Sequence, residues 1–256
     1  MITSRENLIE IAVRVVLMIL FRYYDKATPF IRQIQPEELW LYNYPVTASY
    51  VPSPVLWCIC IGFPTICFAM FFILDPSSRK ECKSAISGLT LAFSLNAFLT
   101  AYIKILVGRP RPDFIERCFP SVKGTDFTKC TGRLDHVYDG RRSFPSGHSS
   151  FSFVVMVFMS LFSARRLEIW TTQRMRGLKL IFCTLPLLLA TTIAISRTCD
   201  YHHHYQDIIV GSVMGSVIAY VTFQLYLKRG GSNSVMVKSK TSSTKEPGDC
   251  SSFNKL

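Results

Sequence analysis

Apolar residues occur along this chain in long blocks separated by polar segments, rather than in alternation. A membrane-spanning helix needs about 20 predominantly apolar residues. Residues 55–74 and 208–227 meet this requirement without a single charged side chain, and residues 85–103 are nearly as long. Residues 149–164 and 180–196 are shorter, but they reach span length when flanking polar side chains extend to the membrane interface. These five blocks predict five membrane-spanning helices.

A further apolar block near the start, residues 8–21, is interrupted by Glu10 and Arg14. The two are four residues apart with the acid first, which is the favourable order for an ion pair on one helix face. We interpret this block as the first span, because no small-residue cleavage site follows that would mark a signal peptide. The chain is therefore predicted to be an all-α integral membrane protein with six transmembrane helices.

The composition agrees with a membrane protein and limits the classes of partner that it is expected to bind. Hydrophobic residues make up 49% of the chain and charged residues only 18%, below the quarter that is usual in soluble domains. The formal net charge is +12. In a soluble protein this excess would point to nucleic acid, but with long apolar blocks it indicates lipid headgroups or an anionic substrate. We expect the lipid bilayer as a partner and no nucleic acid, while the oligomeric state stays open, a homo-oligomer included.

The positions of the positive charges predict the orientation in the membrane. The segments after the second and fourth spans, and the chain after residue 227, are rich in Lys and Arg and are therefore expected to be cytoplasmic together with both termini. The connections after the first, third and fifth spans then face the extracytoplasmic side of the plasma membrane or the endoplasmic reticulum. Loop 108–148 lies on that side although it is rich in arginine, which suggests that it binds an anion. Residues 229–256 predict a disordered cytoplasmic tail after a membrane domain formed by residues 1–228.

The first motif lies at the end of the third span, where Lys104 is followed by Arg111 between Pro110 and Pro112. Cations at a helix C-terminus can simply extend to the headgroups. However, the two prolines restrict the backbone around Arg111 and so fix the direction of its guanidinium group. A fixed planar guanidinium matches the geometry of phosphate oxygens.

The second motif runs from Ser143 to Ser149 and leads into the fourth span. We predict Ser143 as the helix N-cap. The N–H groups of Ser146, Gly147 and His148 then point out of the helix N-terminus, where an anion can bind. Gly147 leaves room for that anion, and His148 can donate a proton. The alternative is an ordinary capped helix start with a histidine placed there by chance.

The third motif joins the fifth and sixth spans and contains Arg197, three consecutive histidines and Asp207. If the sixth helix begins slightly early, His203 and Asp207 share a face. A carboxylate on one imidazole nitrogen leaves the other nitrogen free as a nucleophile. The histidines could instead be metal ligands, but adjacent side chains on a helix diverge and no Cys or further His motif completes a set. We expect no metal and no other cofactor.

The predicted topology brings these three motifs to one membrane face. There Lys104, Arg111 and Arg197 can supply positive charge to a phosphoryl group without a metal ion. Loop 108–148 also contains Cys118 and Cys130, which can form a disulfide if the loop faces an oxidising compartment and otherwise stay as thiols.

Together the motifs resemble those of the lipid phosphate phosphatase family, the type 2 phosphatidic acid phosphatases. Lys104 with Arg111-Pro112 matches K-x6-R-P, residues 145–148 match P-S-G-H, and residues 196–207 match S-R-x5-H-x3-D. The resemblance covers about the first 228 residues. Further segments, among them Gly108 to Phe114, are similar to the diacylglycerol pyrophosphate phosphatase-like subgroup.

The resemblance implies an activity and a role for each motif residue. His203 would attack phosphorus and form a phosphohistidine, Asp207 would orient His203, and His148 would protonate the leaving group. The enzyme would work without Mg²⁺ on phosphatidate, lysophosphatidate and diacylglycerol pyrophosphate. The residues that would hold the phosphoryl oxygens are Lys104, Arg111, Ser146, Gly147 and Arg197.

Two other functions remain open at this stage. The same chemistry could act on a soluble or polyisoprenoid phosphate, although the subgroup-like segments argue against it. A non-catalytic lipid-phosphate binder would keep the positive charges but would not need His203 paired with Asp207. A channel is disfavoured, because no charged or polar residue recurs along the spans.

Overall fold

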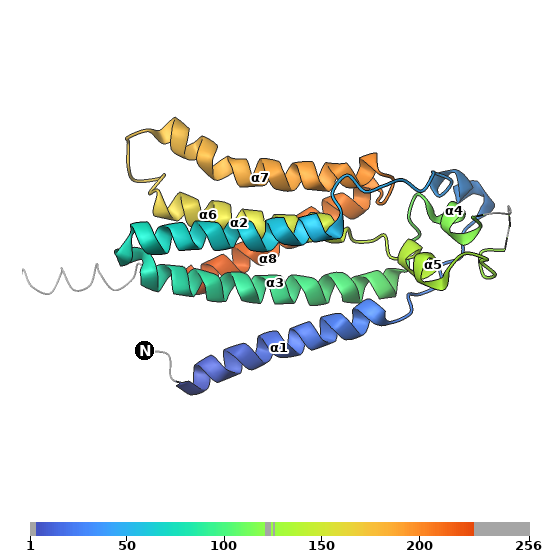
Figure 1. The fold of residues 1–256 in the computed structure, drawn as a ribbon, viewed down its shortest axis with the longest axis horizontal. Coiled ribbons are helices and arrows are strands. Elements are labelled where there is room, and N and C mark those ends of the chain that lie inside the picture. Colours follow the sequence, from blue (N-terminus) through green and yellow to red (C-terminus); the bar gives the residue numbers. More distant parts are fainter. Residues whose placement is uncertain (1–3, 121–123, 125, 228–256) are drawn as a thin grey trace, which may run out of the picture.

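The computed structural model describes residues 4–120, 124 and 126–227, and over these residues the protein is helical without strands (Figure 1). The predicted tail 229–256 lies outside the described residues. In chain order the elements are α1 (Ser4–Lys26), η1 (Pro36–Leu41), α2 (Ser53–Leu74), η2 (Pro76–Ser78), α3 (Arg79–Val107), α4 (Phe114–Cys118), α5 (Leu134–Gly140), α6 (Gly147–Arg166), α7 (Arg176–Cys199) and α8 (Tyr205–Leu227).

Five of these helices are long and apolar enough to cross a membrane, namely α2, α3 with the preceding turn η2, α6, α7 and α8. They coincide with five of the six predicted spans, so the chain is a multi-pass membrane protein. The block at residues 8–21 also forms a helix, the 23-residue α1, but α1 is not among the five. Charged residues recur along α1 from end to end, and they lower its apolar character.

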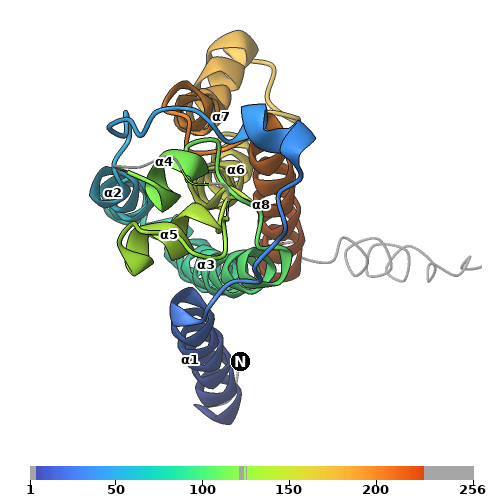
Figure 2. The same ribbon diagram turned by 90° about the vertical axis from the view of Figure 1, so that its right-hand side faces the viewer.

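The ion pair predicted within α1 is present and attaches this helix to the others. Arg14 Nη1 donates to Glu10 Oε2 at 2.7 Å, and Arg14 Nη2 donates to the carbonyl of Ser87 in α3 at 2.8 Å and to the hydroxyl of Tyr226 in α8 at 3.0 Å. Figure 2 shows α1 at the outside of the bundle. Its outward side chains are large and apolar, and they include Leu8, Ile9, Ile11, Val15, Val16 and Ile19.

Helix α6 is the centre of the bundle. Of its membrane-spanning window 67% is buried, against 22–39% for the other four candidate spans. Phe158 and Phe162 of α6 are fully buried and contact the rings of Phe223 and Phe68, which belong to α8 and α2. The helix that begins with the second motif is therefore held rigidly by its neighbours.

Helices α6 and α8 approach each other most closely at two glycines in a Gly-x3-Gly pattern. A Cβ atom added to Gly211 would lie 2.6 Å from the Ser146 carbonyl oxygen, and one added to Gly215 would lie 2.4 Å from that of Ser150. Small residues of this spacing permit close helix contact in membranes. The close approach brings the first turn of α8 beside the start of α6, where the Ser146 N–H donates to the Asp207 carbonyl at 2.9 Å.

Replacement of Gly215 by alanine is expected to destabilise the protein by about 1–3 kcal/mol, because the added methyl group forces α8 away from α6. Thermal unfolding in detergent micelles measures the effect. Gly62→Ala in α2 is the matched control, since a Cβ there has no neighbour within 4 Å. Equal unfolding temperatures for the two variants would contradict the close approach.

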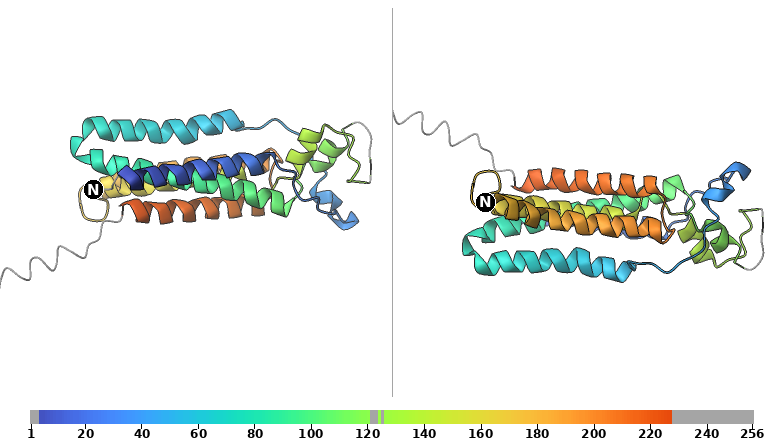
Figure 3. Two further views of the ribbon diagram at one scale, coloured as in Figure 1. Left: turned by 90° about the horizontal axis from the view of Figure 1, so that it is seen from below. Right: turned by 90° about the horizontal axis from the view of Figure 1, so that it is seen from above.

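The connections segregate to the two ends of the bundle. Figures 1 and 3 show the start of α1, the α2–α3 and α6–α7 connections and the end of α8 at one end. At the other end lie η1, α4, α5 and the α7–α8 connection. The end of α3 and the start of α6 are there too, so this end contains all three motifs. The structure therefore brings the three predicted motifs together at one end of the bundle.

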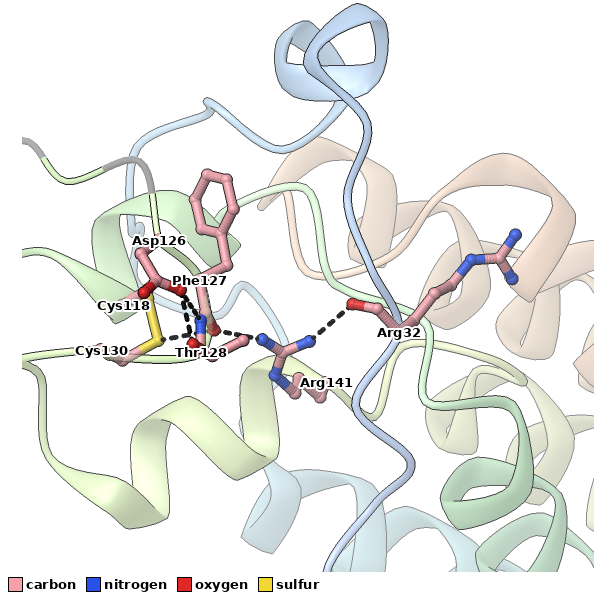
Figure 4. Close-up of a disulfide and its surroundings, with 7 residues drawn as sticks. All are labelled: Arg32, Cys118, Asp126, Phe127, Thr128, Cys130 and Arg141. Carbon is pink, nitrogen blue, oxygen red and sulfur yellow. Dashed lines mark hydrogen bonds between the residues drawn. A yellow bond between two sulfur atoms is a disulfide. The ribbon is translucent and has the colours of Figure 1, made fainter.

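The segments beyond the motif-bearing end form a cap that a disulfide and a buried arginine stabilise (Figure 4). A disulfide joins Cys118 and Cys130, so of the two states left open by the sequence the structure contains the bonded one. Arg141 is 2% exposed and donates to the carbonyls of Arg32 at 3.2 Å and Phe127 at 2.7 Å. It thereby ties the chain after α1 to the disulfide loop.

Candidate active site

A cavity of about 320 Å³ lies where the three motifs meet. Residues from all three motifs line it: Lys104, Arg111, Gly147, His148, Arg197 and His203. A larger cavity of about 620 Å³ along α2 and α3 is almost entirely apolar and contains none of these residues. The polar cavity is therefore the candidate active site.

His203 lies in the turn just before α8 with its side chain 2% exposed, beside the fully buried Asp207. Its Nδ1 is 3.7 Å from Asp207 Oδ2 and 3.4 Å from Ser143 Oγ. Because the Ser143 hydroxyl donates its hydrogen to Asp207, its oxygen can only accept from Nδ1, and the arrangement favours the tautomer with the proton on Nδ1. The Nε2 atom then has the free electron pair. Helix α8 begins at Tyr205, earlier than the apolar block but two residues after His203, so His203 comes beside Asp207 through the turn before the helix and not through the predicted shared helix face.

Asp207 is held by several donors that the sequence did not reveal. Its Oδ1 accepts from Arg109 Nη1 at 2.7 Å, and its Oδ2 accepts from the His204 N–H at 3.0 Å and from the Ser143 hydroxyl. Arg109 was visible in the first motif, but only the fold brings it to a residue 98 positions away. These bonds fix the carboxylate beside His203.

The pKa of His203 lies well below its ordinary value of 6.5. Burial disfavours the protonated ring, Arg111 and Lys104 act in the same direction, and the bond to Asp207 opposes them only partly, so the pKa falls to about 3. A group with a lowered pKa loses its proton earlier as the pH rises. His203 is therefore unprotonated throughout the physiological range, as a nucleophile would have to be.

The lowered pKa predicts that the His203 ring does not titrate near pH 6.5. NMR spectra of ring-¹³C-histidine protein in detergent micelles measure this directly, with His203→Gln to assign the signal. We expect the chemical shift to stay at its neutral value down to roughly one pH unit above the pKa of about 3. A midpoint near 6.5 would contradict the prediction.

The start of α6 differs in one detail from the sequence-based prediction. The N-cap is Ser146 and not Ser143, because the Ser146 hydroxyl accepts from the Ser149 N–H at 3.4 Å while the Ser143 hydroxyl donates to Asp207. The Ser146 N–H donates to the Asp207 carbonyl, and Ser146 does not line the cavity. Of the three predicted N–H donors, only those of Gly147 and His148 belong to the first turn of α6. The N–H groups of a first turn have no acceptor within the helix, so they are available to a ligand.

Gly147 keeps space open between the start of α6 and Lys104. A Cβ atom at position 147 would lie 3.5 Å from Lys104 Nζ and 4.0 Å from Thr100 Cγ2. Any side chain there would extend into the gap between the ammonium group and the helix N-terminus. An anion placed in that gap is near both positive groups.

The two arginines of the cavity are each paired with an acid. Arg111 Nη2 donates to Asp139 Oδ1 at 2.8 Å, and Arg197 Nη1 donates to Asp200 Oδ2 at 2.6 Å. Among the described residues, the buried Nε atoms of both arginines have no hydrogen-bond acceptor. The acids fix the guanidinium groups without using all of their donors. Asp200 lies three residues after Arg197, so this pair could have been predicted, whereas Asp139 could not.

The arginine-rich loop 108–148 is mostly structural, contrary to the expectation that substrate phosphate explains its charge. Arg117 donates to Asp113 and Asp139, and Arg141 and Arg142 donate to backbone carbonyls. Of the arginines in this loop, only Arg111 lines the cavity.

His148 has a backbone partner far away in the sequence. Its Nε2 lies 3.0 Å from the carbonyl oxygen of Val51, 97 residues earlier in the chain. A carbonyl can only accept, so Nε2 donates this bond. No sequence signal pointed to it, because the contact depends on how the segment before α2 crosses the cavity.

The three consecutive histidines have separate hydrogen-bond partners, although His202 lines the cavity together with His203. His202 Nδ1 lies 2.8 Å from the Asp200 carbonyl, and His204 Nε2 lies 3.2 Å from the Pro110 carbonyl. Within the described residues, no three His, Cys, Asp or Glu side chains are grouped so that they could hold a metal ion.

Comparison with known proteins identifies relatives over most of the chain. The profile of the PAP2 superfamily matches residues 85–230, more than half of the sequence. Lipid phosphate phosphatase 2 of Arabidopsis thaliana is 36% identical over 198 residues, which are 75% of this chain and 67% of the relative. Probable diacylglycerol pyrophosphate phosphatase 1 of Schizosaccharomyces pombe is 35% identical over 77% of this chain and 72% of its own length. Diacylglycerol pyrophosphate phosphatase 1 of Saccharomyces cerevisiae is 32% identical over 82% of this chain and 76% of its own length. No solved structure matches.

Proposed function

This chain belongs to the PAP2 superfamily, and we propose that it is a phospholipid phosphatase that works without Mg²⁺ through a phosphohistidine on His203. Its substrates are phosphatidate, lysophosphatidate and diacylglycerol pyrophosphate. The names of its relatives, lipid phosphate phosphatase and diacylglycerol pyrophosphate phosphatase, support a phosphoric monoester and pyrophosphate hydrolase.

One observation carries the proposal: a buried neutral imidazole, a second imidazole and three cationic side chains line a single cavity. His203 Nε2 attacks phosphorus while Asp207 accepts from Nδ1 and so stabilises the developing positive charge. His148 protonates the leaving oxygen. Water then attacks the phosphohistidine and releases inorganic phosphate.

The charge that develops on the phosphoryl oxygens is stabilised by fixed positive groups, which need no rearrangement during the reaction. Ser146 supports the start of α6 and does not itself hold substrate, because its N–H donates to the Asp207 carbonyl and its hydroxyl caps the helix. The groups that hold the phosphoryl oxygens are Lys104, Arg111, Arg197 and the first turn of α6 at Gly147.

The proposed enzyme spans the membrane six times, with α1 as the first span. The apolar outer side of α1 supports this, and so does its charged pair, which is turned inward to α3 and α8. The basic α2–α3 and α6–α7 connections support a cytoplasmic location for that end and for the termini. The disulfide of the cap supports an extracytoplasmic active site, in the plasma membrane or the endoplasmic reticulum.

The test is phosphate release by the full chain in detergent micelles that contain EDTA. We expect release from diacylglycerol pyrophosphate and phosphatidate at the same rate with and without the chelator. Glycerol 3-phosphate, which shares the headgroup but has no acyl chains, should be hydrolysed far more slowly. Loss of activity on chelation would contradict the metal-independent mechanism, and equal rates on the headgroup alone would contradict a lipid substrate.

A further inference from the structure

Residues 44–51, which we call the strap, cross the motif-bearing end of the bundle just before α2 and contact two of the motifs at their outer sides. The N–H of Tyr44 donates to the Pro112 carbonyl at 3.0 Å, and the Tyr44 ring stacks on that of Tyr201 with centroids 4.7 Å apart. The Thr47 hydroxyl donates to the Asp200 carbonyl at 2.6 Å. The strap is therefore anchored to the first and third motifs.

The far end of the strap reaches the remaining motif and the cavity. The Val51 carbonyl accepts from His148 Nε2 at 3.0 Å and from Arg197 Nη1 at 3.3 Å. The Ser49 hydroxyl lines the cavity and accepts from Arg197 Nη2 at 3.4 Å. One short segment thus contacts both the proton donor and a phosphate-binding arginine.

We propose that the strap positions the proton donor of the reaction, with Thr47 as a positioning residue and the Val51 carbonyl as the group that orients His148. This inference rests on the proposed phosphatase function. It assigns the transferred proton to Nδ1, since Nε2 stays bonded to Val51. The Val51 carbonyl thus orients the ring of His148, as the Asp207 carboxylate orients the ring of His203.

The proton balance of the step is simple. The protonated His148 carries one hydrogen on each ring nitrogen. When the P–O bond breaks, its electron pair goes to the leaving oxygen, which takes the proton from Nδ1. The ring is left neutral with its Nε2–H still donated to Val51. In the second half of the reaction Nδ1 accepts the proton of the water that attacks the phosphohistidine.

The role of the strap can be separated from a merely structural one by the choice of leaving group. Phosphatidate releases an alkoxide, which needs the proton. Diacylglycerol pyrophosphate releases a phosphate ester, a much weaker base whose second pKa is about 6. A fault in proton donation therefore slows phosphatidate hydrolysis far more than hydrolysis of the pyrophosphate.

The experiment compares kcat and KM on both lipids for the full-length wild type and for Thr47→Val, which keeps the shape of the side chain but removes the donor to Asp200. We expect kcat on phosphatidate to fall about 10-fold and kcat on diacylglycerol pyrophosphate to fall by less than about 3-fold, with KM little changed. Thr47→Ser, which keeps the hydroxyl, should restore both rates.

Three further variants control the comparison. Thr191→Val removes a hydroxyl that bonds within α7 on an exposed surface, and it should leave both rates unchanged. Ser49→Ala removes a contact to Arg197 alone and should slow both substrates equally. Tyr44→Leu removes the second anchor, so it replaces Thr47→Val if that variant does not fold.

Equal slowing of the two lipids by Thr47→Val and Tyr44→Leu, or no slowing by either, would overturn the positioning role. Failure of the proposed function is a different result, because the wild type would then release phosphate from neither lipid.

Discussion

Replacement of His203 by alanine is expected to lower phosphate release from both phosphatidate and diacylglycerol pyrophosphate by roughly 10⁴-fold or more. The two adjacent histidines are not placed to replace it. The neighbouring rings of His202 and His204 are each bonded to a backbone carbonyl, and neither is paired with Asp207 through its side chain. The rate of phosphate release in micelles, measured on protein shown by size exclusion to be folded, tests the prediction.

The matched control is His204→Ala, which removes the adjacent imidazole without changing the cavity lining. His204 contacts Asp207 through its backbone N–H, and this contact survives the substitution. We expect its rate to stay within about 10-fold of the wild type. If His204→Ala is the inactive variant and His203→Ala is active, the nucleophile has been misassigned.

Asp207→Asn is expected to reduce kcat by about 10²–10⁴-fold with a much smaller change in KM. The buried carboxylate accepts from Arg109, Ser143 and the His204 N–H, and it lies beside His203 Nδ1. An amide offers one acceptor oxygen and a donor NH₂ group among these donors, so the favoured tautomer of His203 is lost. Steady-state kinetics on diacylglycerol pyrophosphate measure the effect.

A double-mutant comparison identifies how the carboxylate acts. Arg109→Gln alone should lower kcat by about 10-fold, because it loosens Asp207 without removing it. In the Asp207→Asn background the same substitution should have almost no further effect, since the carboxylate that Arg109 holds in place is already gone. Fully multiplicative losses would show that Arg109 acts independently of Asp207.

The helices and the principal side chains of the site were predictable because their signals are local. Long apolar blocks predict α2, α3, α6, α7 and α8, and the positions of the blocks bring the motifs to one end. His203 and Asp207 are only four residues apart, so they lie close together although His203 belongs to the turn before α8 and not to the helix. Lys104, Arg111 and Arg197 were recognisable as cations at the ends of apolar blocks.

The partners of these side chains were not predictable, because they come from distant parts of the chain. Arg109 reaches Asp207 across 98 residues and Arg111 reaches Asp139 across 28. The helix start at Ser146 was misplaced at Ser143 because the Ser143 hydroxyl is used by Asp207, a contact that exists only once α8 packs against α6. For the same reason the structural arginines of loop 108–148 could not be told apart from a phosphate-binding set.

The most direct test of the account is to trap the covalent intermediate. Full-length enzyme is mixed with diacylglycerol pyrophosphate labelled with ³²P in the terminal phosphate, quenched in alkali within milliseconds, digested and mapped. The account predicts label on the peptide that contains His203, stable in alkali and released by acid, and no label in His203→Ala. Release of inorganic phosphate by the wild type in a single turnover, with no labelled histidine at any time point, would contradict it.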